Sequence, residues 1–336
     1  MLSIWTVLTV FSRTVPEIMN IAIFGTGSMG KTHASIYKNF KDVDSVTIVG
    51  RDELKTKELA KTLDIYGSTD IEEVLRDSSI TIIDVCMPTH LHKEFVISAL
   101  ENNKHVLCEV PISYNLDDAL EMVRKAEATK KIFQVAQLMR SVAEISYIAE
   151  KVKSGLLGKI LSAYFHRYQR YKVDEPIIDL MGFDLDTVNN LLGLPESVLT
   201  TKSNRIGAEE FFAILNYPDL SCLVEFKTIM SKGFPLSHGV RMVGINGILE
   251  TNTVFTGPKQ TAPIPETSVT FYPRGEKKEE VVIKGHDPYE QECRYFIDTV
   301  LGKVDGKLLD AIHAVNTLKI AVAIKKSLET SEEVHL

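Results

Sequence analysis

Three glycines between residues 25 and 30 have the spacing of a turn that binds a diphosphate. Gly25, Gly27 and Gly30 form the pattern GxGxxG directly after the apolar run 21–24. The first glycine of such a pattern permits a tight turn, the second lets a pyrophosphate approach the backbone, and the third lets the next helix pack closely. A strand pattern precedes the glycines and a helical pattern follows them, which is the context that makes the motif informative. We therefore predict a dinucleotide site, with a structural glycine turn as the alternative, whose contacts are Gly25, Thr26, Gly27, Ser28, Met29 and Gly30.

The end of the next predicted strand, 46–49, is where such a fold contacts the adenosine ribose. An acidic residue there would bind the 2′-hydroxyl of NAD, whereas an arginine suits the 2′-phosphate of NADP. Gly50 leaves the acidic position empty and Arg51 follows it. We predict NADP as the preferred cofactor and NAD as the alternative. In the simpler interpretation, Arg51 is solvated and Asp52 only caps the following helix.

Buried strands and helices alternate from residue 19 to residue 139. Apolar strand patterns cover 46–49, 80–87, 104–109 and 132–137, with helical patterns between them. This alternation predicts an α/β domain of the Rossmann type, whose parallel sheet binds ligands beyond the carboxyl ends of its strands. Those ends include 88–90 and 109–111, so Pro88 and Thr89 are also expected to contact the cofactor.

The pattern changes near Arg140, where strand-like runs begin to dominate. We predict strands at 160–168, 198–202, 211–215, 222–226, 240–243, 248–251, 269–272 and 281–283, and helices at 142–153, 176–192, 288–301 and 310–328. Residues 140–331 are therefore expected to form an α+β domain with a largely antiparallel open sheet. Residues 1–18 are expected to be an appendage, because Met19 stands directly before the first strand. A membrane anchor is the alternative, although the apolar run is shorter than the roughly 20 residues that span a bilayer.

The composition excludes several classes of partner. The chain has 336 residues and a net charge of −7, and no block of lysine or arginine suggests binding to nucleic acid or to a membrane. Its four cysteines form no CxxC pair, and we expect neither a metal site nor disulfides. Cys86 and Cys108 lie in apolar strand patterns, which indicates buried thiols in a reducing, cytoplasmic compartment.

The chain resembles the glucose–fructose oxidoreductase and inositol dehydrogenase (Gfo/Idh/MocA) family from residue 19 to about residue 331. The resemblance is carried by GTGSMGKTHA at 25–34, MPTHLHKEFVISAL at 87–100, HVLCEVP at 105–111, the strand that ends at Arg140, and the turn 155–158. It implies an NAD(P)-dependent oxidoreductase that acts on a small molecule, often a sugar or cyclitol. It also implies His92 in the cofactor wall and a homo-oligomer formed through the C-terminal sheet.

Two departures from the family pattern concern the proton-transfer groups. The family signature Glu-Lys-Pro, whose lysine typically lies beside the nicotinamide, is Glu109-Val110-Pro111 here. In the second signature, Asp-x-Gly-x-His-x-x-Asp, Phe183 stands where the histidine typically acts as acid and base. Neither Val110 nor Phe183 can exchange a proton. Such groups typically contribute about 10²–10⁴-fold to a rate.

The retained carboxyl groups are the candidates for chemistry. Asp179, Phe183 and Asp186 are spaced i, i+4, i+7, so on one helix they would share a face. Asp179 is our candidate for substrate contact or proton handling, with a helix-terminal carboxylate as the alternative. Glu109 is expected at the nicotinamide ribose, with a plain salt bridge as the alternative. We interpret His90 as a solvated loop residue, with replacement of the missing acid as the alternative.

Four basic residues make the region around the expected cleft positively charged. Arg140, Arg167, Arg170 and Lys172 could hold an anionic substrate group through guanidinium forks. Ordinary salt bridges are the alternative. Together, Val110, Arg140, Arg167 and Phe183 form the expected substrate pocket. The functional hypotheses are an oxidoreductase with an altered acid/base set and, alternatively, an inactive NAD(P)-binding sensor or regulatory subunit.

Overall fold

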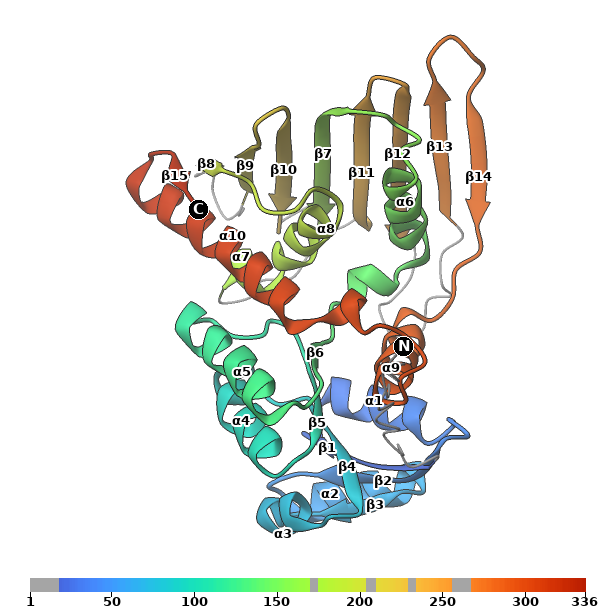
Figure 1. The fold of residues 1–336 in the computed structure, drawn as a ribbon, viewed down its shortest axis with the longest axis vertical. Helices are drawn as coiled ribbons and strands as arrows, with labels where there is room; N and C mark the ends of the chain where they lie inside the picture. Colours follow the sequence, from blue (N-terminus) through green and yellow to red (C-terminus); the bar gives the residue numbers. More distant parts are fainter. Residues whose placement is uncertain (1–17, 170–174, 204–209, 229–233, 256–266) are drawn as a thin grey trace, which may run out of the picture.

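The computed structural model describes residues 18–169, 175–203, 210–228, 234–255 and 267–336. Within these residues the chain forms two sheets, one in each half of the molecule (Figure 1). None of the described helices is both long enough and apolar enough to cross a lipid bilayer. The predicted appendage, apart from Ile18, lies outside the described residues.

The first sheet has six parallel strands in the order β3-β2-β1-β4-β5-β6. This is the strand order of a dinucleotide-binding fold, with the order reversing between β1 and β4. Ligands of such sheets bind at that reversal, beyond the carboxyl ends of the strands. The strands are β1 (Met19–Phe24), β2 (Val43–Val49), β3 (Tyr66–Ser68), β4 (Ile80–Val85), β5 (His105–Cys108) and β6 (Phe133–Val135).

Helices connect these strands and place polar side chains at the ligand-binding edge. The elements are α1 (Ser28–Tyr37), α2 (Glu53–Leu63), α3 (Ile71–Arg76), η1 (Thr89–Leu91), α4 (His92–Glu101) and α5 (Leu116–Thr129). Apolar residues of β1 and β4 are fully buried, which is why these strands are continuous apolar runs rather than alternating ones. The prediction of a Rossmann-type α/β domain is confirmed.

The second sheet has nine strands in the order β14-β13-β12-β11-β7-β10-β9-β8-β15. All neighbours are antiparallel except β7 and β10, which run parallel. The strands are β7 (Ile160–Tyr168), β8 (Ser197–Ser203), β9 (Glu210–Asn216), β10 (Ser221–Lys227), β11 (Leu236–Gly244), β12 (Gly247–Phe255), β13 (Thr267–Pro273), β14 (Glu279–Ile283) and β15 (Val334–His335). The predicted largely antiparallel α+β sheet is confirmed, and only the short edge strand β15 was missed.

The helices α6 (Ala143–Lys153), α7 (Pro176–Asp179), α8 (Gly182–Leu192) and α10 (Ala311–Thr330) lie over one face of this sheet (Figure 1). The expectation of one continuous helix over 176–192 is wrong. The chain leaves helical geometry at Leu180, whose φ is −121°, and a new helix begins at Gly182. This break lies beside the cavity described below.

One C-terminal helix packs against the N-terminal half. α9 (Pro288–Val300) lies against α1 (Figure 1) and buries Cys293, Phe296 and Ile297 in the same core cluster as β1 and β2. Arg294 on this helix pairs with Asp42, at 2.7 Å between Nη1 and Oδ1. A helix from the C-terminal part of the sequence therefore belongs to the core of the N-terminal half. The domain boundary at 139/140 stays a prediction.

Candidate active site

The glycine turn has one position that the fold leaves open. Gly25 has a φ of +123°, and a Cβ there would lie 2.3 Å from the carbonyl oxygen of Cys86. A Cβ on Gly30 would lie 2.0 Å from the carbonyl oxygen of Gly25, so both glycines are required by packing. Gly27 is different, because it has a φ of −75° and a Cβ there would meet nothing within 4 Å. The open space at Gly27, directly before α1, is where the motif places a pyrophosphate.

The ribose end of the expected cofactor site is shaped by Gly50. A Cβ on this residue would lie 2.5 Å from Cγ2 of Thr26 and 2.6 Å from Oγ1 of Thr56, so packing leaves no room for an acidic side chain. Arg51 is exposed at this edge. Asp52 caps α2, accepting a hydrogen bond from the backbone N–H of Lys55 at 3.0 Å. The choice between NAD and NADP stays a prediction.

The residues expected to contact the cofactor at the end of β4 are held in position by a buried histidine. Pro88 and Thr89 lie at the edge, exposed and half-buried respectively. His92, by contrast, is 1% exposed, with Nε2 2.8 Å from the carbonyl oxygen of Met87 and Nδ1 3.0 Å from that of Pro111. Burial lowers the pKa of His92, so the neutral ring donates to one carbonyl at a time. His92 therefore joins the ends of β4 and β5 and positions the wall.

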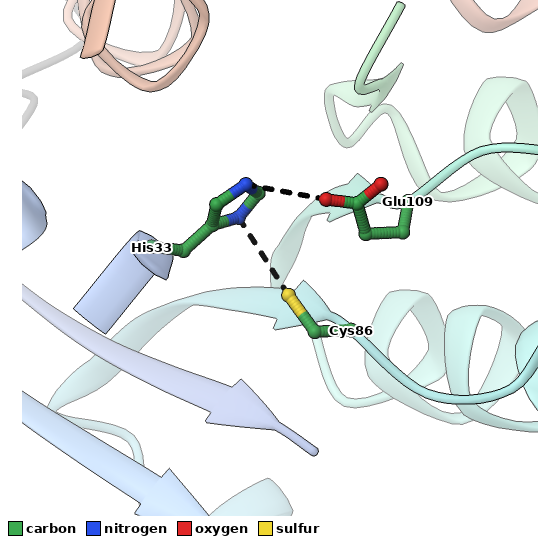
Figure 2. A group of neighbouring side chains, drawn as sticks. All are labelled: His33, Cys86 and Glu109. Atoms are coloured by element: carbon green, nitrogen blue, oxygen red, sulfur yellow. Dashed lines mark hydrogen bonds and ion pairs between the residues drawn. The ribbon is translucent and has the colours of Figure 1, made fainter. Parts of the chain in front are cut away.

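Glu109, at the carboxyl end of β5, belongs to a buried network that the sequence did not reveal. Its Oε1 lies 3.2 Å from Nε2 of His33, whose Nδ1 lies 2.8 Å from Oδ2 of Asp84 (Figure 2 shows His33 and Glu109). Glu292 of α9 is also fully buried, and it interacts electrostatically with both His33 and Glu109. The plain salt-bridge interpretation of Glu109 therefore describes its present contacts, and contact with a ribose remains a proposal.

The charges in this network shift one another's pKa values. Burial alone would lower the pKa of His33, but its attraction to Asp84 and their hydrogen bond, with Glu109 and Glu292 adding to them, raise that pKa to about 10. Burial raises the pKa of Glu109, which His33 partly offsets. Burial and the charge of Glu109 raise the pKa of Glu292 well above its usual range. His33 is thus the cation around which three buried carboxyl groups are arranged.

Replacing His33 by glutamine is expected to reduce the free energy of unfolding in a pH-dependent way. The pKa rises from 6.5 to about 10 on folding, so the stabilisation is fully present below pH 6.5 and is lost as pH rises through 10. We expect a loss of at least about 1 kcal/mol below pH 6.5 that shrinks toward pH 10. Urea unfolding at pH 6, 8 and 10 measures it, with His335→Gln at the exposed C-terminus as the control. A loss that grows with pH would contradict this assignment.

The same cluster offers three donor atoms of types that bind metals. A nitrogen of His33, the sulfur of Cys86 and an oxygen of Glu109 lie within 4.8 Å of one another (Figure 2). Sequence spacing could not show this, because the residues come from α1 and from the ends of β4 and β5. Nδ1 of His33, which lies 3.6 Å from the Cys86 sulfur, is already bonded to Asp84. The ion pairs account for the arrangement of these groups.

A cavity that is partly open to solvent lies where the two halves meet. It brings together three of the predicted residues, Val110, Asp179 and Phe183, together with Asp186. Asp179, Phe183 and Asp186 therefore share one cavity wall, although they lie on two separate helices and not on one helical face. The other lining residues are Pro111, Ile112, Gln137, Leu138, Met139, Ile178, Gly182, Ala314, Thr317, Leu318 and Ala321.

The predicted roles of Arg140 and Arg167 in the pocket are wrong. Neither residue lines the cavity, and each guanidinium is held by a buried aspartate. Arg140 contacts both carboxylate oxygens of Asp186, at 2.7 to 3.2 Å, and Arg167 binds Asp184 at 2.8 and 3.0 Å. These bidentate pairs use Nε and Nη2 of both guanidiniums, and Nη1 of Arg140 donates to the carbonyl oxygen of Leu308 at 2.9 Å. Arg170 and Lys172 lie outside the described residues.

Tyr114 is a site residue that the sequence interpretation missed. It follows the 109–111 turn, and its hydroxyl lies near Thr89 on the expected cofactor wall and near Asp179 on α7. Burial, with the nearby Asp179, raises the pKa of this phenol, so it stays protonated at neutral pH. The two halves of the site are therefore linked by a tyrosine that the cofactor and substrate motifs do not include.

Comparisons with known proteins agree with this arrangement. Residues 19–137 match the model described as "Oxidoreductase family, NAD-binding Rossmann fold". The chain is 28% identical over 200 residues to 2,7-anhydro-N-acetylneuraminate hydratase of Escherichia coli, covering 56% of this chain and 53% of the relative. It is 29% identical over 142 residues to myo-inositol 2-dehydrogenase of Thermotoga maritima, covering 42% of each. The chain thus spans about half the length of the curated relatives it matches, or less.

A solved structure shows that the likeness in fold extends over nearly the whole chain. Levoglucosan dehydrogenase in complex with NADH superposes with a TM-score of 0.80 over 94% of this chain and 98% of that one, at 18% identity. At this identity the likeness concerns the fold alone. The resemblance first seen in the glycine turn is confirmed for residues 19–137, which match the Gfo/Idh/MocA oxidoreductase model, and the likeness of the remaining chain is one of fold.

Proposed function

We propose that this protein is an NAD(P)-dependent oxidoreductase of a small carbonyl or imine compound, working without the family's usual lysine and histidine. The observation that carries the proposal is the cavity between the halves, where Val110 and Phe183 meet the carboxyl edge of the Rossmann sheet. Three findings support a cofactor at that edge. They are the matched family model, the relatives that are dehydrogenases by name, and the open space at Gly27. NADP is the first choice because Gly50 excludes an acidic side chain and Arg51 is exposed beside it.

The chain's own residues would bind, orient and shield the reacting groups. The N–H groups at the start of α1 would hold the diphosphate, and Glu109 would meet the ribose near the end of β5. The bound cofactor supplies or accepts a hydride, and the protein orients it. The apolar walls Val110 and Phe183 would exclude water from the reacting carbon. Asp179, with the hydroxyl of Tyr114 near it, is the remaining group at the wall that could guide a proton.

The second candidate is an NAD(P)-binding sensor that has lost turnover. One observation favours it: none of the described residues that line the cavity is a lysine or a histidine. We also propose a homo-oligomer that uses the face of the second sheet opposite α8. On β7, Tyr164, His166 and Tyr168 form a ladder of rings with centroids 5.5 and 5.0 Å apart, while Arg167 points to α8.

A turnover screen separates the two candidates. The purified protein with NADPH or NADH, or with NADP⁺ or NAD⁺, is assayed by nicotinamide absorbance against cyclic imines, enones, ketones, sugars and polyols. We expect turnover of at least one class. Saturable cofactor binding without turnover of any compound would contradict the enzyme and favour the sensor, and absence of cofactor binding would contradict both.

A further inference from the structure

The cavity combines apolar walls with hydrogen-bond acceptors. Ten of its lining residues are apolar, namely Val110, Pro111, Ile112, Leu138, Met139, Ile178, Phe183, Ala314, Leu318 and Ala321. Most of the polar groups at its wall are hydrogen bonded to one another. Asp186 accepts hydrogen bonds from Nε2 of Gln137 at 2.6 Å and from Oγ1 of Thr317 at 3.1 Å. A polyol would leave most of its hydroxyls without partners here, which is costly in a closed site.

The groups at the cavity wall that can still hydrogen bond to a ligand are acceptors. Gln137 is 3% exposed, and its Oε1 has no hydrogen-bond partner among the described residues. Because Asp186 requires the amide N–H₂ of Gln137, this oxygen is fixed as an acceptor. The carboxyl group of Asp179 lies on the same wall. A ligand that fits these groups carries N–H or O–H donors, or a positive charge.

The charges around the cavity favour a cation. The carboxyl group of Asp179 lines it, whereas the charge of Asp186 is paired with Arg140 and that of Glu109 is paired with His33. The guanidinium of Arg140 is bound to Asp186 and does not enter the cavity. An anionic substrate would therefore meet no free described cation at this wall, whereas a cation would be attracted to it.

We propose, resting on the proposed function, that the substrate is an iminium ion with a compact apolar body, reduced to an amine, or the corresponding amine in the reverse direction. The cofactor's hydride adds to the carbon of the C=N bond, and the π electron pair becomes the lone pair of the nitrogen. The iminium is reduced by two electrons and the dihydronicotinamide is oxidised by two. No proton is transferred, so no acid is required. A ketone, by contrast, needs a proton at its oxygen, which Val110 and Phe183 cannot give.

The test compares two substrates of one shape that differ in charge. The holoenzyme with NADPH is assayed with 2-methyl-3,4-dihydroisoquinolinium, an iminium whose charge is fixed, and with the neutral ketone 2-tetralone, both corrected for the reaction without protein. We expect kcat/KM for the iminium to exceed that for the ketone at least about 100-fold, the lower end of what a missing acid costs. We also expect the iminium rate to be independent of pH between 6 and 8.

Two variants separate the pocket's effect from the reactivity of the iminium itself. Asp179→Asn is expected to raise KM for the iminium about 10-fold, because it removes a counter-charge. Val110→Lys is expected to lower kcat/KM for the iminium and to raise it for the ketone. If neither variant changes the preference, or if the ketone or myo-inositol is the better substrate of the wild type, the substrate class is wrong while the oxidoreductase stands. If cofactor binds and no compound turns over, both proposals fail.

Discussion

A chain in which Val110 is replaced by lysine and Phe183 by histidine is expected to oxidise myo-inositol with NADP⁺ or NAD⁺ about 10²–10⁴-fold faster than the wild type. Both residues line the cavity at the edge of the Rossmann sheet, and both stand at positions where the family resemblance implies proton-transfer groups. A lysine at 110 would reach the reacting hydroxyl from the end of β5. A histidine at 183 would approach it from the start of α8.

The cavity also provides the control for this gain of activity. Leu138 lines the same space but does not occupy a family acid/base position. A Leu138→Lys, Phe183→His chain therefore adds the same side chains and should remain near wild-type activity. Equal gains in both double variants would show that any lysine in the cavity suffices. No gain in the Val110→Lys, Phe183→His chain, with cofactor binding retained, would mean that the chemistry was lost elsewhere as well.

Changing Gly27 to alanine is expected to weaken binding of the reduced nicotinamide cofactor about 100-fold, equivalent to roughly 2.7 kcal/mol, while the melting temperature stays unchanged. The backbone at Gly27 suits alanine, with φ −75° and ψ −170°, and the added methyl would meet no protein atom within 4 Å. The methyl would occupy the space through which a pyrophosphate reaches the backbone.

The neighbouring glycines cannot serve for this test, because substitution at Gly25 or Gly30 would push a Cβ into backbone atoms and disturb the fold. Ser35→Ala, farther along α1, is the matched control and should bind like the wild type. Isothermal titration measures affinity, and thermal unfolding measures stability. An alanine at 27 that leaves affinity unchanged would place the cofactor elsewhere.

Most of the fold could be predicted because its local signals agree with one another. The helices at 53–63, 71–76 and 116–129 lie where helical patterns follow the predicted strands, and each is capped by an Asp or Asn at its N-terminus. Strand β7 also matches, because its side chains alternate between a buried and a solvent-facing side. The break at Leu180 was missed because the sequence around it is compatible with one continuous helix.

The sequence predicted only those parts of the candidate site that belong to a recognisable motif. Val110, Asp179 and Phe183 meet in the cavity as expected. The network of His33, Asp84 and Glu292 joins α1, β4 and α9, so no spacing in the sequence could reveal it. The arginines were assigned to a pocket because the sequence showed four cations, whereas their partners, Asp184 and Asp186, are identified only by the fold.

The most direct test of the central claim is to titrate NADPH and NADH into the purified wild-type protein and follow nicotinamide fluorescence. The claim is that a dinucleotide lies against the turn 25–30 and faces a cavity whose proton-transfer pair has become apolar. It predicts saturable binding of both cofactors, with dissociation constants in the range of about 1 µM to 1 mM that is typical of enzyme substrates and with NADPH the tighter. The absence of any fluorescence change up to about 1 mM of either cofactor would contradict it.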